Sequence, residues 1–159
     1  VVEVEDEVTA YMEYPDGATG VLVASTGEAP GTNRLEIAGS RGRLVVENGR
    51  ITFTRNEVPS DVFIKTSEEK FTKPGIWNVD VPVPEGGTQH AIITQNFVDA
   101  ILDGTPLLAR GEEGINSLEL ANAMIYSSCI RKPVDLPLDG AAYARLLKKL
   151  IAGSKQRGK

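Results

Sequence analysis

Apolar and polar residues alternate with a period of two along the first two-thirds of the chain, which is typical of β-strands. Turn-forming residues interrupt this pattern. Pro15-Asp16-Gly17 and Gly39-Ser40-Arg41-Gly42 mark two turns, and Asn48-Gly49 is the strongest hairpin signal in the chain. The pattern predicts strands at about 8–14, 19–26, 34–38, 43–47, 51–55, 62–65 and 76–83, and Pro82 predicts an edge position or a bulge for the last of them.

From residue 88 onward the apolar residues recur at helical spacing. The first predicted helix carries Ile93, Phe97 and Ile101 on one face and ends at Asp103-Gly104, before Pro106. Two further helices follow, with the apolar stripes Leu118, Ala121, Ile125, Cys129 and Tyr143, Leu146, Leu147, Leu150, Ile151. Asp139 is placed to cap the last helix at its N-terminus.

Strands in one block and helices in another predict the α+β class. We expect an open-faced, mostly antiparallel β-sheet over about 1–87 and about three α-helices over about 88–153, packed on one face of the sheet. A basic tail at 154–159 is expected to follow as a solvated helix end that frays. A length of 159 residues fits a single domain.

Charge and cysteine content exclude several classes of protein. The net charge is −5, which argues against a general nucleic-acid binder, and no apolar run approaches the length that spans a membrane. Acidic residues dominate positions 1–36, whereas 141–159 carry only basic charges. A single cysteine, Cys129, excludes an internal disulfide and indicates a reducing, cytoplasmic location.

Most catalytic constellations are missing from the chain. His90 is the only histidine, so no histidine pair or His/Cys cluster can hold zinc. Gly-x-Ser-x-Gly, Gly-Lys-Ser/Thr and Gly-x-Gly-x-x-Gly motifs are all absent. Cys129 falls on an apolar helical stripe, where a thiol is normally an inert filler. Glu5 and Glu7 share a strand face, although a metal or acid–base role for them is the minor alternative. We therefore expect no catalytic, cofactor-binding or metal site in this chain.

Several stretches together resemble the C-terminal domain of the Gfo/Idh/MocA family of NAD(P)-dependent oxidoreductases. The first is Tyr-Pro-Asp-Gly-Ala-Thr-Gly at 14–20, continued by Ser-Thr-Gly-Glu-Ala-Pro-Gly-Thr-Asn-Arg-Leu-Glu-Ile-Ala-Gly-Ser-Arg-Gly at 25–42. The second is Gln-His-Ala-Ile-Ile-Thr-Gln-Asn-Phe-Val-Asp-Ala-Ile-Leu-Asp-Gly-Thr-Pro at 89–106, followed by 111–123 and by Val134-Asp135-Leu136-Pro137. Their order and spacing carry the resemblance over nearly the whole chain.

The resemblance implies a substrate and oligomerisation domain of a dehydrogenase acting on a sugar, a polyol or a related hydroxy or keto compound. Members of the family hold NAD or NADP in an N-terminal Rossmann domain, which this chain lacks and which is its expected partner. The catalytic Lys of the family's Glu-Lys-Pro motif and its Asp/His pair are also missing here. Thr72-Lys73-Pro74 is only superficially similar, and we interpret Lys73 as a loop lysine. We expect this chain alone to bind no cofactor and to be inactive.

Within this interpretation, the loop from Ser25 to Arg34 is the best candidate for contacting substrate. Its hydroxyl, amide and guanidinium groups suit a polyhydroxylated ligand. The candidate residues are Ser25, Thr26, Asn33 and Arg34, together with His90 at a helix start. Two alternatives stay open: the loop is merely a connection in which Arg34 pairs with a nearby acid, and His90 is a capping or interface residue.

We also expect the open face of the sheet to mediate a homodimer or tetramer. Candidates for the shared face are Thr9, Tyr11 and Glu13, or Met12 and Tyr14, together with members of the 43–55 hairpin that include Phe53. Trp77 is assigned to sheet packing or to this interface. Two other functions stay open: a stand-alone protein-interaction or ligand-binding α+β module, and a small stand-alone enzyme.

Overall fold

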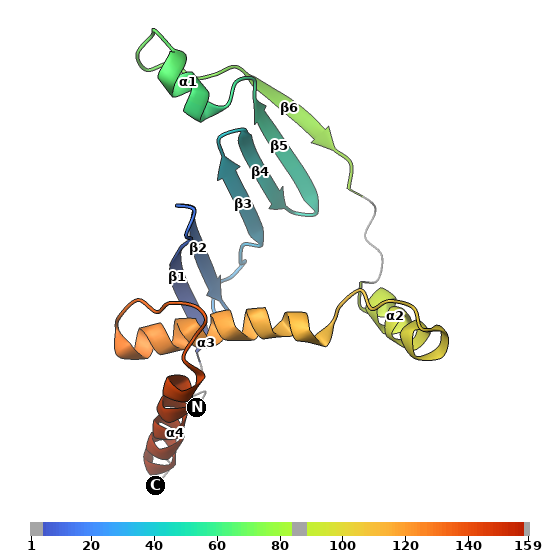
Figure 1. Ribbon diagram of the computed structural model, residues 1–159, viewed down its shortest axis with the longest axis vertical. Helices are drawn as coiled ribbons and strands as arrows, with labels where there is room; N and C mark the ends of the chain where they lie inside the picture. The colour runs from blue at the N-terminus through green and yellow to red at the C-terminus, as the bar shows by residue number, and fades with distance from the viewer. Residues whose placement is uncertain (1–4, 84–88, 158–159) are drawn as a thin grey trace. The chain divides into compact units, whose positions relative to one another are not determined.

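The computed structural model describes residues 5–83 and 89–157, and the described chain belongs to the α+β class (Figure 1). The chain divides into two compact units. One comprises residues 1–27 and 88–159, and the other comprises residues 28–87. Strands precede the main helices, as the sequence predicts, and the described strands pair as two antiparallel sheets rather than one.

The first sheet is a hairpin of β1 (Glu7–Glu13) and β2 (Thr19–Ser25), in register with Tyr11 opposite Val21. The predicted turn at Asp16-Gly17 is confirmed. Gly17 has φ +86°, a left-handed conformation that glycine adopts at low cost. Asp16 Oδ1 accepts a hydrogen bond of 3.0 Å from the backbone N–H of Ala18, which closes the turn locally.

The two faces of this hairpin differ in exposure. Val8, Ala10 and Met12 point to one face and are half-buried. Tyr11 points to the other face with its cross-strand neighbours Val21 and Val23, and all three are exposed. The hairpin therefore presents apolar side chains to solvent on the face that also carries Thr9 and Glu13.

The second sheet has the strand order β3-β4-β5-β6, with β3 (Arg34–Gly39), β4 (Gly42–Glu47), β5 (Arg50–Asn56) and β6 (Ile76–Val81). Asn48 (φ 52°) and Gly49 (φ 70°) join β4 to β5, which confirms the predicted hairpin turn. β6 is an edge strand and ends just before Pro82, in agreement with the prediction for this proline.

The register of this sheet places most of its apolar side chains on one face and most of its charged side chains on the other. One face carries Leu35, Ile37, Leu44, Val46, Ile51, Phe53, Trp77, Val79 and Val81. Trp77 and Phe53 thus belong to the sheet face, as expected, and the Arg55 guanidinium lies 5.1 Å from the centre of the Trp77 ring. The opposite face carries Arg34, Glu36, Arg43, Glu47 and Arg50.

The predicted strand at 62–65 is wrong, because these residues lie in the short helix α1 (Ser60–Thr66). Val62-Phe63-Ile64 is a short apolar run, and periodicity does not separate a strand from a helix over so few residues. The end signals favour the helix. Pro59 precedes its first residue, Asp61 lies in the first turn and Lys65 lies in the last.

The long helices begin with α2 (Gln89–Asp103), which ends at Gly104 (φ 70°) as predicted. Asn96 forms two hydrogen bonds with the segment that follows α2. Its Nδ2 donates to the carbonyl of Pro106 at 3.0 Å, and its Oδ1 accepts from the N–H of Leu108 at 2.8 Å. A 3₁₀ turn, η1 (Gly111–Glu113), then leads directly into α3 (Gly114–Ile130).

The predicted buried stripe of α3 is wrong. Leu118 is 61% exposed and Cys129 is exposed, so the thiol is not a core filler in the described chain. Ala123 is the buried residue of this helix, at 7% exposure. The reason is tertiary: the contacts to the following segment fall at Glu119, Tyr126 and Ser127, on the side of Ala123.

The last helix, α4 (Gly140–Arg157), begins as predicted. Asp139 Oδ1 accepts hydrogen bonds from the N–H groups of Ala141 (2.9 Å) and Ala142 (3.1 Å), which confirms the N-cap. The Tyr143 ring packs edge-on against Tyr126 of α3, with 6.4 Å between ring centres. α4 extends to Arg157, four residues beyond the predicted end. Within the described ranges, none of the helices combines the length and apolar character needed to cross a membrane.

Candidate functional site

The five candidate substrate residues fall in both units of the chain. Ser25, Thr26 and His90 belong to the unit that holds the hairpin and the long helices. Asn33 and Arg34 belong to the unit that holds the four-stranded sheet. The candidates therefore form local groups, and each group is described within its own unit.

Ser25 and Thr26 close the end of the β1–β2 hairpin. Ser25 Oγ accepts a hydrogen bond of 3.1 Å from the N–H of Gly27. Thr26 donates to the carbonyl of Asp6 from its backbone N–H (2.9 Å) and from its Oγ1 (3.3 Å). A hollow of about 250 Å³ lies beside them, lined by Glu5, Asp6, Glu7, Val8, Ala24, Ser25 and Thr26. Both hydroxyls border this hollow while they stabilise the turn.

Arg34 lies on the charged face of the four-stranded sheet and is paired with acids. Its guanidinium forms an ion pair with Glu36, two residues along the same strand, and donates from Nη1 to Glu47 Oε2 at 3.2 Å. The Arg43 guanidinium lies 3.7 Å from the second carboxylate oxygen of Glu36. The structure thus shows Arg34 paired with nearby acids, as expected if the 25–34 loop is a connection rather than a substrate contact.

This network shifts two pKa values in opposite directions. The hydrogen bond from Arg34, supported by the charges of Arg34 and Arg43, lowers the pKa of Glu36 below its ordinary value. The reciprocal hydrogen bond to Glu36, with the charge of Glu47, raises the pKa of Arg34. Both groups are solvent-exposed, so the network is screened by salt and acts as a fixed charge pattern rather than as a proton donor.

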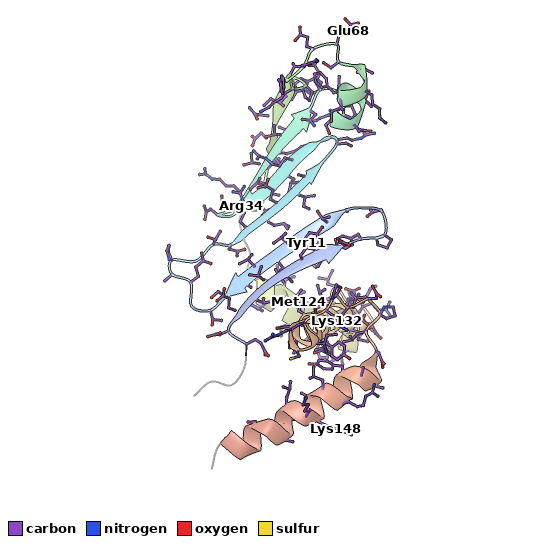
Figure 2. All side chains as sticks on the ribbon, turned by 90° about the vertical axis from the view of Figure 1, so that its left-hand side faces the viewer. Tyr11, Arg34, Glu68, Met124, Lys132 and Lys148 are labelled. Atoms are coloured by element: carbon purple, nitrogen blue, oxygen red, sulfur yellow. The ribbon has the colours of Figure 1, made fainter. Side chains whose placement is uncertain are left out.

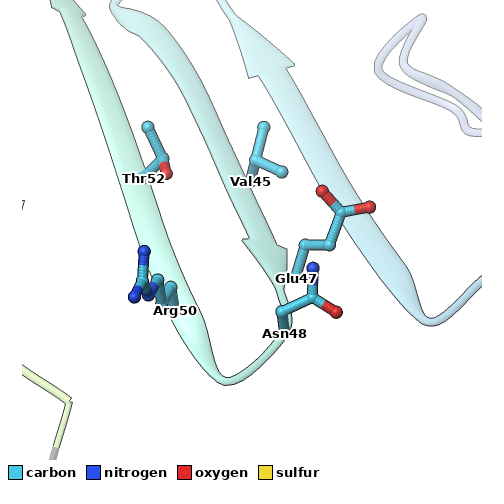
Figure 3. A pocket seen from close by; sticks show the side chains of 5 residues that line it. All are labelled: Val45, Glu47, Asn48, Arg50 and Thr52. Carbon is cyan, nitrogen blue, oxygen red and sulfur yellow. The ribbon is translucent and has the colours of Figure 1, made fainter.

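A second hollow, of about 390 Å³, lies on this charged face beside the β4–β5 turn (Figure 3). It is lined by Val45, Glu47, Asn48, Arg50 and Thr52. Sequence reasoning missed these residues as a site, although the signal was present. The Asn48-Gly49 turn places Glu47 opposite Arg50, so a carboxylate, an amide and a guanidinium gather at one hairpin end. Such a set can exchange several hydrogen bonds with a hydroxylated ligand.

His90 lies in the first turn of α2 and is exposed. Its carbonyl accepts a hydrogen bond of 2.8 Å from Thr94 Oγ1, one helical turn further on. Lys73 lies in the loop between α1 and β6, as expected for a loop lysine. Across the part of the chain that the structure describes, no group of three or more His, Cys, Asp or Glu residues is placed to hold a metal ion.

A model of the oxidoreductase family's C-terminal alpha/beta domain, that of Gfo/Idh/MocA proteins, matches residues 1–136. The chain belongs to this family. A comparison with curated proteins found no match. All five candidate residues of this Gfo/Idh/MocA domain lie inside the matched range, and so do both hollows. The helix α4 begins at Gly140, after the matched range ends.

Proposed function

We propose that this chain is the substrate and oligomerisation domain of an NAD(P)-dependent dehydrogenase acting on a sugar, a polyol or a related hydroxy or keto compound. The match of the oxidoreductase C-terminal domain to residues 1–136 carries the proposal. The chain supplies contacts to substrate and to other subunits. Hydride transfer takes place with a nucleotide-binding domain that acts as its partner.

The residues of this chain do not fit a nicotinamide dinucleotide. Binding of its pyrophosphate in this type of enzyme uses a glycine-rich turn between a strand and a helix, and the 16 glycines here include no Gly-x-Gly-x-x-Gly. The described strands are antiparallel, so no parallel βαβ unit is available among them either. The cofactor therefore belongs to the partner domain, and this chain contributes polar groups around the substrate.

The groups offered to substrate are neutral hydrogen-bonding groups and fixed charges. In one unit Ser25 and Thr26 carry hydroxyls that border a hollow, and in the other unit Asn33 and Arg34 carry an amide and a guanidinium. Within each unit, groups of this kind can bind a ligand with many hydroxyls, because each hydroxyl both donates and accepts. His90 adds an exposed imidazole at a helix start.

Calorimetric titration of the chain with NADH and with NADPH tests whether the cofactor binds to the partner domain rather than to this chain. We expect no heat of binding with either dinucleotide, because the pyrophosphate turn is missing. Micromolar affinity for either one would overturn the proposal.

A second experiment tests the substrate contacts. Backbone and side-chain NMR signals are followed while myo-inositol or D-glucose is added. We expect shifts confined to Ser25, Thr26, Asn33, Arg34 and His90 and their neighbours, and loss of the shifts at 25 and 26 in Ser25→Ala/Thr26→Val. Shifts located only around Arg50 and Thr52 would move the site to the second hollow and contradict the assignment.

We further propose that the apolar face of the four-stranded sheet packs against a second copy in a homodimer or tetramer. Leu35, Ile37 and Trp77 are each more than half exposed on this face. A contiguous apolar surface of this kind is rarely left in water. Phe53→Asp should disrupt this packing, measured as a lower mass by light scattering. The single Cys129, an exposed thiol, supports a location in a reducing compartment, the cytoplasm.

A further inference from the structure

Helix α4 separates its charges and its apolar side chains onto different sides. Leu147, Leu150 and Ile151 lie on one side and are 44%, 44% and 49% exposed. Arg145, Lys148 and Lys149 are exposed on the remaining surface. Residues 141–159 hold six basic residues and no acid, and the helix lies beyond the range that the family model matches. The exposed side of α4 is therefore an apolar strip with basic edges.

The basic edges follow from helical spacing. Residues three apart are neighbours on a helix surface. The half-buried Leu146 lies one turn before Leu150 and forms the other edge of the apolar strip. Lys148 is adjacent to Ile151 and Lys149 is adjacent to Leu146, so one lysine lies on each side of the strip. Arg145 lies on the side of the helix away from Leu150 and does not border the strip.

One face of the β1–β2 hairpin is also apolar at its centre, but its charged residues are acidic instead of basic. Tyr11, Val21 and Val23 are 63%, 69% and 62% exposed at its centre. Glu7 and Glu13, at the two ends of β1, lie on the same face and are exposed. The first 33 residues contain no Lys or Arg, so nothing basic on the hairpin neutralises these carboxylates. This face is an apolar centre with acidic ends.

We propose that α4 of one copy docks on the β1–β2 hairpin of a second copy. Leu147, Leu150 and Ile151 pack on Tyr11, Val21 and Val23, while Lys148 and Lys149 meet Glu7 and Glu13. Each copy offers one helix and one hairpin, so a two-fold axis forms the contact twice and closes the dimer. Figure 2 marks Lys148 on the helix and Tyr11 on the hairpin. The apolar centres supply the affinity, and the charged edges set the orientation.

This contact is independent of the proposed reaction, and it uses a different surface from the apolar face of the four-stranded sheet. The two contacts are therefore separable by substitution. If both form, the assembly is a tetramer, and removal of one contact leaves a dimer that is held by the other.

Sedimentation of the full chain tests the proposal. We expect wild type to sediment at twice the 17.1 kDa chain mass or more, and to dissociate more readily as salt is raised. Lys148→Glu/Lys149→Glu should weaken the assembly by about tenfold or more, because like charges then face each other. Adding Glu7→Lys/Glu13→Lys to that variant should restore it. Arg145→Glu reverses one charge on the side of α4 away from the strip and should have no effect, whereas Lys148→Glu alone, which changes the net charge by the same amount, should weaken the assembly.

Four results would overturn the proposal: a monomeric wild type, an assembly that is insensitive to salt, a Lys148→Glu/Lys149→Glu variant that assembles normally, or a combined variant that fails to reassemble. Circular dichroism checks that each variant is folded. If the charge-reversed helix does not fold, two other measurements decide the question: the salt dependence of the wild-type assembly, and the assembly of Tyr11→Ser, which should be weakened. An assembly that is lost in Phe53→Asp, persists in Tyr11→Ser and does not depend on salt belongs to the sheet face instead.

Discussion

The backbone N–H of Leu138 donates a hydrogen bond of 2.8 Å to Glu119 Oε1, joining the segment before α4 to the middle of α3. Glu119 lies one helical turn from Ala123, the buried residue of α3. Glu119 lies outside the apolar stripe of Leu118, Ala121, Ile125 and Cys129 that the sequence predicts, so the pattern assigns it no role in packing. The structure gives it a specific role, since it accepts a hydrogen bond from a partly buried backbone group that no helix or strand satisfies.

Glu119→Ala should lower the free energy of unfolding by about 1–2 kcal/mol, because the N–H of Leu138 loses its acceptor. Glu119→Gln is the matched control. Its amide oxygen can accept the same hydrogen bond, so most of the stability should be retained. Urea denaturation of the three proteins measures the difference. Equal losses in both variants would mean that the carboxylate charge, and not the hydrogen bond, matters.

Ala123→Leu tests which side of α3 is packed. The side chain of Ala123 is buried, so three additional carbon atoms should overpack the site and cost about 1–3 kcal/mol. Ala121→Leu adds the same atoms to an exposed position of the same helix and should be nearly neutral. Thermal unfolding of both variants gives the comparison. A larger loss of stability in Ala121→Leu than in Ala123→Leu would mean that the buried side of α3 is the stripe predicted from the sequence.

Local features of the fold could be predicted because their causes lie within a few residues. The Asn48-Gly49 turn, the Gly104 helix end and the Asp139 cap each depend on one conformational preference or one side-chain acceptor. Strand positions could also be predicted, because apolar and polar residues alternate with a period of two in the five strands before α1 and in β6.

What could not be predicted depends on contacts distant in sequence. The buried side of α3 follows from contacts made by Leu138 and Tyr143, which no helical pattern contains. The helix α1 has only three apolar residues in its centre, too few for a period to be recognised. At the candidate site, the pairing of Arg34 with Glu47 comes from the strand register across thirteen residues.

The ion pairs of Glu36 predict a graded pH response. Because Arg34 lowers the pKa of Glu36, the stabilisation from this pair is present at neutral pH and is lost as pH falls through the lowered value in the folded state. Both groups are exposed, so the effect on stability is small and decreases with salt. NMR titration of the Glu36 carboxyl measures the shift directly.

We expect Arg34→Gln to raise the pKa of Glu36 most, because it removes the hydrogen bond as well as a charge. Arg43→Gln removes only a more distant charge and should raise it less. Arg50→Gln, on the same face, is the control and should leave it unchanged. If Arg43→Gln had the larger effect, the principal partner of Glu36 would be misassigned.

The turn between β3 and β4 offers a sharp contrast between two glycines. Gly42 has φ +142°, a region that residues with a side chain rarely adopt, and a Cβ there would collide with the carbonyl oxygen of Thr54 on β5. Gly39, opposite it in the β3–β4 register, has open space around the corresponding position. Gly42→Ala should therefore destabilise the chain by about 1–3 kcal/mol through backbone strain, with the steric clash adding to it. Gly39→Ala should change stability little. Chemical denaturation distinguishes them, and equal stability of the two variants would show that the β3–β4 turn does not hold Gly42 against β5.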